Sequence, residues 1–385
     1  MSSKKHLDAH AAPPQALRQF YKTYQKSALS SEEADHIIDF DRELHPSAQD
    51  SLTQVGSVSA QRLKQICEDF HSSETGGDIG VTLGEDNLDR PIYECLQIIP
   101  RLLPPKTQLC LLSRMLHRDL SSPRHKTNVH AHYNFAYPQD IERAEDPPSS
   151  QRPSSGVRVE ESFFNRSPLS RPFSAKDPIA HKPIDLAQFL NKKLRWMTLG
   201  GQYDWTRKVY PDETPPAFPE DLARFLHGLF PSMRPEAAIV NFYSPGDRLS
   251  LHRDVSEYCD NGLISVSLGC DGLFIVGLDD DDNSTPNDET SSQIGESSSG
   301  TSRHLIIRLR SGDAVYMSRR ARYAWHGVPR IISGTCPAWM ESWPASAGSA
   351  GSGSQGSRQN EQGFKEWKGW MANKRINLNV RQIRT

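Results

Sequence analysis

Apolar and polar residues alternate through much of the second half of the chain, beginning at Ala237. Successive side chains of a β-strand point to opposite faces, so a period of two predicts strands with one buried face. Turn sequences such as Ser244-Pro-Gly-Asp247 separate the runs. The predicted strands are 237–243, 249–254, 263–268, 273–276, 304–310, 314–317 and 375–383. Many short strands joined by turns predict a sandwich, a jelly roll or a closed barrel, in a mainly β (α+β) chain.

The first half of the chain has helical rather than alternating spacing. Apolar residues recur every three or four positions, as Leu17, Phe20 and Tyr24 do near the N-terminus. This spacing places them on one face of a helix. The predicted helices are 15–26, 59–71, 107–120, 186–196 and 218–230. We therefore expect residues 1–120 to form an N-terminal helical extension of the β-rich part.

Low-complexity stretches divide the chain further. Residues 121–182 are rich in Pro, Ser and Arg. We expect them to be a linker, because long connections without periodicity are functional or disordered. The remaining residues, 183–385, form the predicted β-rich domain. Within it, an acidic stretch at 279–302 and a Gly/Ser-rich stretch at 342–363 have few apolar residues, so both are expected to be disordered inserts.

Charge is nearly balanced over the whole chain and uneven along it. The 385 residues carry a net charge of −2, so no global field attracts a polyanion. Residues 303–330 contain seven Arg and one acid, and residues 364–385 contain six Lys or Arg and one acid. These stretches could face phosphates or could be solvated charged faces.

The sequence also constrains the partners and the compartment. No apolar run approaches the length of a membrane span, so no membrane partner is expected. The six cysteines form no Cys-x-x-Cys pair, which argues against a structural zinc site. The cytoplasm and nucleus are the expected compartments, and a mildly basic N-terminus also allows a mitochondrial presequence. A monomer is expected.

A His-x-Asp pair, His252 and Asp254, lies in one predicted strand after a Pro-Gly turn. Residues i and i+2 of a strand share a face, so an imidazole and a carboxylate lie side by side. A second histidine, His326, lies 72 residues after Asp254. Each feature alone is commonly an ordinary core or surface residue. Together they match the two-His, one-carboxylate set of non-haem Fe(II) oxygenases, and the absence of His-Glu-x-x-His favours iron over zinc.

A strand near the C-terminus presents Arg375, Asn377 and Arg381 on one face. Oxygen chemistry at an open Fe(II) site needs two further electrons, which 2-oxoglutarate supplies by decarboxylation with O2. Arginine pairs well with the carboxylates of such a diacid. Asn241 and Tyr243, again two residues apart, offer uncharged donors. The alternative for this strand alone is an exposed polar face.

Three aromatic residues, Trp196, Tyr203 and Trp205, lie close together before the β-rich part. Aromatic side chains beside a basic surface can stack nucleobases. They can equally fill the core or close one end of a barrel. The residues alone leave both interpretations open.

Several of these segments together resemble the AlkB family of Fe(II)/2-oxoglutarate dioxygenases. They are NFYSPGD with LHRD, SVSLG, GDAVYMS with RYAWHGV, and RINLNVR, and they span Trp196 to Arg381. The continuation RDVSE, the segment LRWMTLGGQYDW and the early ALRQFYKTYQ are similar to the fungal-type AlkB homologue 1 subfamily in particular.

The resemblance implies a double-stranded β-helix (jelly roll) core with an N-terminal nucleotide-recognition lid. It implies that His252, Asp254 and His326 bind Fe(II). The positions that match 2-oxoglutarate contacts of the family are Asn241, Tyr243, Arg375, Asn377 and Arg381. Trp196 and Tyr203 match positions that contact substrate, and Trp205 is a weaker candidate. Ser256 stands where the bacterial pattern has an acid, and the acidic 279–302 replaces a short basic loop.

The resemblance further implies a nucleic-acid dioxygenase that removes or oxidises base methyl groups. The expected substrates are tRNA bases such as 1-methyladenosine or 5-methylcytidine, or unpaired DNA, because a base must leave its stack to reach a buried iron. Ascorbate is a candidate reductant. The alternative enzyme is a 2-oxoglutarate-dependent protein (histone) demethylase or hydroxylase. A non-catalytic nucleic-acid-binding module is disfavoured because the triad is complete.

Overall fold

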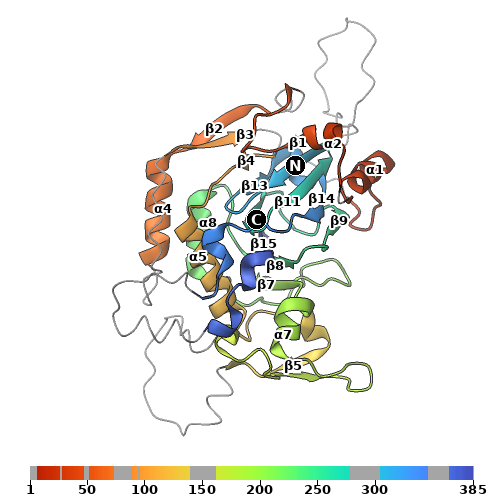
Figure 1. Cartoon of the computed structure of the whole chain (residues 1–385), viewed down its shortest axis with the longest axis vertical. Coiled ribbons are helices and arrows are strands. Elements are labelled where there is room, and N and C mark those ends of the chain that lie inside the picture. Colours follow the sequence, from red (N-terminus) through yellow and green to blue (C-terminus); the bar gives the residue numbers. More distant parts are fainter. Residues whose placement is uncertain are drawn as a thin grey trace, which may run out of the picture.

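Two β-sheets pack face to face in the computed structural model of the chain (Figure 1). The structure describes residues 7–26, 28–46, 52–72, 88–93, 96–138, 162–277, 304–345 and 364–384. One sheet has eight strands and the other has five. A large cluster of buried apolar side chains lies within this framework. The arrangement confirms the predicted jelly roll, and the family comparison below leads to the same fold class.

The eight-stranded sheet has the order β2-β3-β4-β13-β10-β15-β8-β7, with antiparallel neighbours. Its strands are β2 (Gln54–Val58), β3 (Arg90–Tyr93), β4 (Ile98–Ile99), β7 (Trp196–Gly200), β8 (Ala237–Tyr243), β10 (Leu263–Gly269), β13 (Ala314–Met317) and β15 (Arg375–Arg381). Strand β15 lies between β10 and β8, so Asn377 is opposite both Ser267 and Asn241. The last strand in sequence therefore runs through the middle of the sheet.

The five-stranded sheet has the order β1-β12-β11-β14-β9. Its strands are β1 (Ile37–Ile38), β9 (Leu249–His252), β11 (Gly272–Gly277), β12 (His304–Leu309) and β14 (Trp325–Ile331). Strand β1 runs parallel to β12, and the other pairs are antiparallel. Gly277 and His304 are cross-strand partners at the end of the β11–β12 pair.

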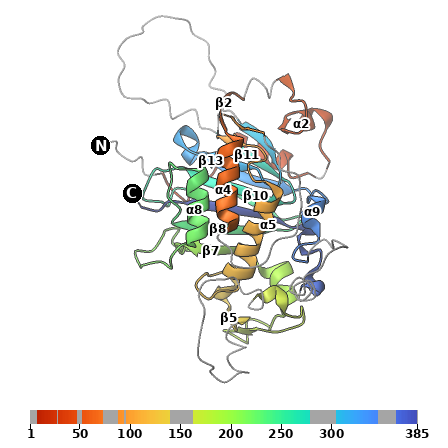
Figure 2. The same ribbon diagram turned by 90° about the vertical axis from the view of Figure 1, so that its left-hand side faces the viewer.

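Helices α4 (Ala60–Ser72), α5 (Pro105–Ser113) and α8 (Glu220–Leu229) lie side by side over the outer face of the eight-stranded sheet (Figure 2). The buried side chains of α8 recur at helical spacing, at Leu222, Phe225, Leu226 and Leu229. Glu220 and Asp221 lie in its first turn, where the helix dipole favours acids. The remaining α-helices are α1 (Gln15–Thr23), α2 (Ser31–Asp35), α7 (Leu186–Gln188) and α9 (Ala338–Glu341).

Shorter helical turns connect these elements. Two π-helical turns continue α5 and α7: η1 (Arg114–Asp119) and η5 (Phe189–Lys193). The 3-10 turns are η2 (Asn128–Ala131), η4 (Phe163–Asn165), η7 (Arg319–Tyr323), η8 (Lys365–Trp367) and η9 (Trp370–Asn373). Within the described part of the chain, no helix is both long and apolar enough to span a bilayer.

The N-terminal 120 residues differ from the expected helical extension. Strand β1 joins the five-stranded sheet, and β2 to β4 extend the other sheet. Helix α1 packs near β14, and the Tyr21 hydroxyl lies 2.9 Å from the backbone oxygen of Leu249. A strand of two residues, such as β1, is too short to show a periodic pattern. The sequence therefore predicted the helices of this region and not its strands.

The described parts of 121–182 fold, although a linker was expected there. Strands β5 (Tyr133–Phe135) and β6 (Phe173–Ala175) pair with each other. Phe135 makes edge-on contacts with Phe163, Phe173 and Phe189. These rings are irregularly spaced in sequence and so gave no periodic signal, but in the fold they join the main apolar cluster.

The two expected inserts fall largely outside the described residues. The acidic stretch 279–302 lies entirely outside them, as do residues 346–363 of the Gly/Ser-rich stretch. Residues 342–345 are described, and the Trp343 side chain among them is buried. Trp343 therefore packs in the folded part of the protein, although it lies within the second expected insert.

Candidate metal centre and co-substrate cavity

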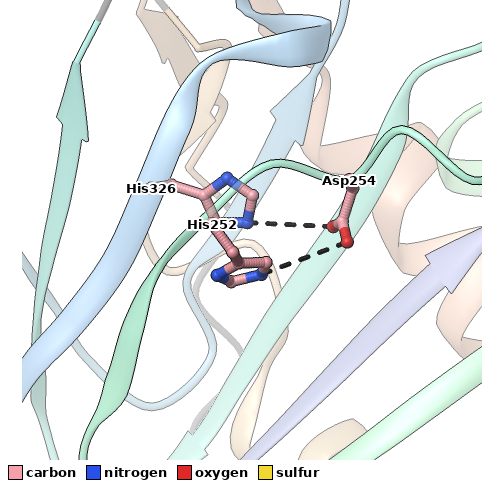
Figure 3. A group of neighbouring side chains, drawn as sticks. All are labelled: His252, Asp254 and His326. Atoms are coloured by element: carbon pink, nitrogen blue, oxygen red, sulfur yellow. Dashed lines mark ion pairs between the residues drawn. The ribbon is translucent and has the colours of Figure 1, made fainter. Parts of the chain in front are cut away.

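His252 and His326 are cross-strand partners on neighbouring strands, β9 and β14. Their ring centroids are 4.3 Å apart. Asp254 follows β9 and faces both imidazoles (Figure 3). One ligand atom from each residue lies within 4.8 Å of the others. The strand pairing thus brings together the three residues that the sequence predicted as metal ligands.

Backbone contacts orient both histidine rings. The Nδ1 atom of His252 lies 2.9 Å from the Ser250 carbonyl, and that of His326 lies 3.0 Å from the Ala324 carbonyl. With a proton on Nδ1, each Nε2 has a lone pair available for a metal. The two Nε2 atoms lie 4.0 Å and 3.7 Å from the Asp254 carboxylate.

The local electrostatics favour a neutral His326 and an ionised Asp254. Burial, assisted by His252, lowers the pKa of His326 to about 4. Burial opposes ionisation of Asp254, but Arg381 and the two histidines outweigh it and hold its pKa well below the usual range. These are the protonation states that metal ligands need.

The chemistry of these three side chains fits a divalent metal. The Asp254 Oδ2 atom is buried and has no hydrogen-bond partner, whereas Oδ1 accepts a bond from Arg381 at 2.8 Å. A buried carboxylate oxygen without a partner is costly, and a metal ion would satisfy it. Two imidazoles and one carboxylate form the facial triad of non-haem Fe(II) oxygenases. The structure contains no second such group of His, Cys, Asp or Glu among its described residues.

A cavity lies between the two sheets and reaches His326. Both sheets contribute its lining, which consists of Tyr243, Leu249, Leu263, Ser265, Phe274, Leu309, Met317, His326, Val328, Arg375, Asn377 and Asn379. Most of this lining is apolar, and one residue, Arg375, is a permanent cation. The composition suits a small anionic molecule held at one end and shielded from water along its length.

Arg375 is fully buried and forms no ion pair with another described residue. Its Nη1 donates to the carbonyl of Cys270, and its Nη2 donates to the Ser267 hydroxyl at 2.8 Å. Its Nε is buried and has no partner. Burial lowers the pKa of Arg375, which reflects the cost of a cation without an anion. A ligand carboxylate would offset that cost.

The structure separates the five residues expected around 2-oxoglutarate. Tyr243, Arg375 and Asn377 line the cavity. Asn241 is not in the lining and lies opposite Asn377 in the sheet. Arg381 is also absent from the lining, because its guanidinium contacts Asp254 instead.

Two polar lining residues were missed from the sequence. Ser265 accepts a hydrogen bond from the Asn377 side chain at 2.7 Å. Asn379 lines the same cavity, and its Oδ1 is buried without a partner. The period of two that selected Arg375 and Asn377 also selects Asn379, so that signal was available in the sequence.

The three candidate aromatic residues form one group beside the metal centre. The Trp196 and Trp205 rings are 5.0 Å apart, and Tyr203 meets Trp205 edge-on at 4.9 Å. The Tyr203 hydroxyl lies 3.2 Å from the Ser256 hydroxyl, two residues after Asp254. Trp205 is 44% exposed, so part of the group faces solvent.

The arginine-rich stretches near the C-terminus do not all form a solvated face. Arg308 pairs with Asp271 at 2.7 Å, and Arg322 pairs with Glu257 at 2.8 Å. Exposed cations instead surround the start of β7, at Lys126, Lys192, Lys193 and Arg195. The Asn128 side chain holds this region together by bonding the backbone of Lys193, Arg195 and Trp196.

A match to known families agrees with this fold and site. Residues 157–381 match the model of the 2OG-Fe(II) oxygenase superfamily, so the chain is an oxygenase of this class. That superfamily uses Fe(II), 2-oxoglutarate and O2.

Three relatives indicate which family of this superfamily the chain belongs to. The N6-methyladenosine RNA demethylase ALKB1 of Pyricularia oryzae is 42% identical over 388 residues, covering 98% of each chain. The N6-methyladenosine RNA demethylase ALKBH of Cryphonectria parasitica is 46% identical over 66% of this chain and 99% of its own length. The tRNA demethylase abh1 of Schizosaccharomyces pombe is 32% identical over 75% of this chain and 79% of its own. The chain belongs to the AlkB homologue 1 family of Fe(II)/2-oxoglutarate dioxygenases.

Proposed function

We propose that the protein oxidatively demethylates N-methylated adenine in RNA. The observation that carries this proposal is the aromatic group of Trp196, Tyr203 and Trp205. It is partly exposed on one side, and on the other side it contacts Ser256, next to the metal ligands. A planar base can stack on such a group while its methyl group approaches the metal.

The metal and co-substrate residues have separate roles in the proposed reaction. His252, Asp254 and His326 would hold Fe(II). The chemistry supplied at a bound Fe(II) would be oxidative: 2-oxoglutarate and O2 would be converted to succinate and CO2 while the N-methyl carbon is hydroxylated, and the product would lose formaldehyde to leave the free base. Arg375 binds one carboxylate of 2-oxoglutarate through its planar fork, and Tyr243 lies directly opposite it in the sheet. Ascorbate is proposed as the reductant in the assay.

Apolar residues of the cavity exclude water from the reaction. Leu249, Leu263, Phe274 and Val328 line the cavity between Arg375 and His326. Their packing protects a reactive site from bulk solvent and strengthens the electrostatic contacts of Arg375. The chain therefore contributes positioning and desolvation to the reaction.

The distribution of cations supports a nucleic acid over a peptide. Lys126, Lys192 and Lys193 are exposed and form no ion pair with other described residues. They adjoin Trp196, because the Thr198 amide donates to the Lys126 carbonyl and the Trp196 amide lies against Asn128. Phosphates on either side of a stacked base would meet these cations.

The proposal is tested by nucleoside mass spectrometry. Total RNA, tRNA and DNA are incubated separately with the purified protein, Fe(II), ascorbate and 2-oxoglutarate. We expect N6-methyladenosine or 1-methyladenosine to decrease in RNA, with formaldehyde released. The His326→Ala variant should abolish turnover and leave RNA binding within a few-fold, because His326 is a metal ligand in this proposal. Turnover by the variant would refute the metal assignment.

Two other results would change the substrate. Conversion of 5-methylcytidine to an oxidised base would keep the nucleic acid and move the reaction to a C-methyl group. Succinate formation driven by a histone peptide mixture, with every nucleoside unchanged, would favour the protein-demethylase alternative.

A further inference from the structure

Four charged residues form a closed ring of contacts at the candidate metal centre, which we call the circuit: Asp254, Arg381, Glu257 and Arg322. Arg381 Nη2 donates to Asp254 Oδ1 at 2.8 Å. The Nε of Arg381 lies 2.9 Å from Glu257 Oε1, a close ion pair without the alignment of a hydrogen bond. Arg322 Nη2 donates to the other Glu257 oxygen at 2.8 Å. Arg322 Nη1 returns to the backbone oxygen of Asp254 at 2.7 Å.

The circuit is buried and electrically balanced. The side chains of Arg322 and Glu257 are each 2% exposed, and that of Arg381 is 5% exposed. Two cations alternate with two anions, so each buried charge has an opposite neighbour. Removing one partner would leave the others uncompensated, which is far more costly than the absence of the whole group. The four residues therefore act as a unit.

The circuit fixes the metal ligand from two sides. Arg381 occupies one oxygen of the Asp254 carboxylate, and the other oxygen, Oδ2, remains without a hydrogen bond. Arg322 holds the backbone of Asp254 and also donates to the Asn261 carbonyl, which anchors its own position. A carboxylate held in this way keeps Oδ1 toward His252, at 4.0 Å, and Oδ2 toward His326, at 3.7 Å.

Arg381 is accordingly separated from the co-substrate cavity. Its Nη1 lies 3.2 Å from the Tyr210 hydroxyl, on the side away from Asp254. Its other two nitrogens contact Asp254 and Glu257, and the residue is absent from the cavity lining. Arg375, at the other end of β15, has no such anionic partner among the described residues. The two arginines of one strand face therefore contact different groups: Arg375 contacts neutral oxygens, and Arg381 contacts carboxylates.

We propose that Glu257 and Arg322 are positioning residues for the metal centre. They hold Arg381 and the Asp254 backbone in place and so fix the Asp254 carboxylate that faces the two histidines. The proposal rests on the metal centre and not on the identity of the methylated base. It can therefore be tested without nucleic acid, and its failure is distinct from failure of the proposed substrate.

The test is a titration of the full-length, metal-free protein with Co(II), followed by visible absorption of the bound ion. Glu257→Gln keeps the shape of the side chain and removes its charge. Because outer contacts of metal ligands typically change affinity 10- to 100-fold, we expect Co(II) binding to weaken by about that factor. Glu220→Gln, at an exposed position of α8, is the matched control and should bind Co(II) as the unmodified chain does.

A second titration measures 2-oxoglutarate binding to the Co(II)-saturated protein. We expect Arg375→Met to weaken 2-oxoglutarate binding and to leave Co(II) affinity within about three-fold, because Arg375 contacts none of the four residues of the circuit. Co(II) binding weakened by Arg375→Met as much as by Glu257→Gln would show that loss of any nearby buried charge has this effect, and would overturn the proposal.

A purely structural role for the circuit makes a different prediction. In that case Glu257→Gln would lower thermal stability while the folded fraction bound Co(II) with unchanged affinity, and the inference would be wrong. If Glu257→Gln does not fold, Arg322→Lys replaces it, because lysine keeps the charge and loses the fork that spans Glu257 and the Asp254 backbone. Unchanged Co(II) affinity in Arg322→Lys would equally refute the proposal.

Discussion

Arg375 shows how much one residue can indicate about a ligand. A guanidinium buried in a mainly apolar cavity, with three hydrogen bonds to neutral oxygens and no carboxylate, is an expensive feature of a folded chain. Such a cation is retained where it meets an anion that the chain does not itself provide. The dicarboxylate 2-oxoglutarate, which the oxygenase superfamily uses, is that anion.

Replacement of Arg375 by methionine separates co-substrate binding from folding. Loss of a buried charge partner costs roughly 2–5 kcal/mol of binding, so the KM for 2-oxoglutarate should rise about 100-fold. The melting temperature should stay the same or increase, because an unpaired buried cation is removed. Arg384→Met, on the exposed end beyond β15, is the control and should leave KM unchanged. A large loss of stability with an unchanged KM would contradict the role of Arg375.

At this scale the sequence brought the three proposed metal ligands together but did not indicate which groups Arg381 contacts. Period-two spacing placed His252 beside Asp254, and Arg375 beside Asn377, on the correct faces. The same spacing grouped Arg381 with Arg375, but a shared face does not determine which group a long side chain contacts. The acids that Arg381 meets come from a loop after β9, and this proximity exists only in the folded chain.

Among the elements, the π-helical turn η1 carries an unusually buried histidine. His117 stacks between Trp343 and Phe364, with ring centroids 5.0 Å and 4.6 Å away. Its Nδ1 lies 2.8 Å from the Ser162 hydroxyl. Burial lowers the pKa of His117 to about 3 from an ordinary 6.5. The folded protein therefore keeps this ring neutral at pH values where the unfolded chain protonates it.

This histidine should make folding sensitive to mild acid. As the pH falls below 6.5, His117 becomes protonated in the unfolded chain but stays neutral in the folded chain. The free energy of unfolding therefore decreases progressively down to about pH 3. At pH 5 the loss is about 2 kcal/mol relative to neutral pH. His117→Phe keeps the stacking and removes the titration. Urea unfolding at pH 7.5 and pH 5 should therefore show a smaller acid loss for the variant, and an equal loss would refute the assignment.

Element prediction succeeded where amphipathic periodicity was long and failed where it was short. The helix expected at 218–230 is α8, Glu220–Leu229, and the one expected at 59–71 is α4, Ala60–Ser72. The helix expected at 186–196 ends in a π-turn at Lys193, and Trp196 begins β7. Trp196 lies where β7 pairs with β8, and that pairing is a tertiary effect that helical spacing cannot contain.

At the scale of the whole molecule, ion pairs connect the segment around β1 to the five-stranded sheet of the jelly roll. Asp39, just after β1, is buried and bonds Arg310 of the β12–β13 turn through both carboxylate oxygens. Arg308 of β12 lies 3.6 Å from the same carboxylate. Burial opposes ionisation of Asp39, but the Arg310 contacts outweigh it and keep its pKa below the usual value. Strand β1 and Asp39 are thus part of the same fold as the two sheets.

Loss of the Asp39 carboxylate should destabilise the entire fold. Asp39→Ala removes the buried carboxylate that Arg310 contacts and leaves Arg310 with Asp41 alone, at 2.9 Å, so the free energy of unfolding should fall by about 3 kcal/mol. A single cooperative urea transition at lower midpoint would show that the N-terminal segment unfolds with the sheets. Asp35→Ala, an exposed position at the end of α2, should change the free energy by less than about 0.5 kcal/mol. A separate early transition in Asp39→Ala would indicate an independent N-terminal unit.

The jelly roll itself was predictable, because its strands alternate and its turns are marked. The attachment of the N-terminal segment was not, since it depends on two residues of parallel strand and on charges far apart in sequence. Charge counts left the basic stretches as either phosphate-binding or solvated charged faces. They could not distinguish an exposed arginine from one that a distant acid neutralises inside the fold.

The pairing of Gly277 with His304 has an evolutionary consequence. The chain leaves β11 and returns to β12 at facing positions, beside the strand that carries His326. Closing a longer connection between fixed ends costs only about 0.6 kcal/mol per doubling of length. Insertions, deletions and exchanges between Gly277 and His304 therefore cost the two-sheet scaffold little stability. The length of the chain can change here while the strands that carry His252 and His326 stay as they are.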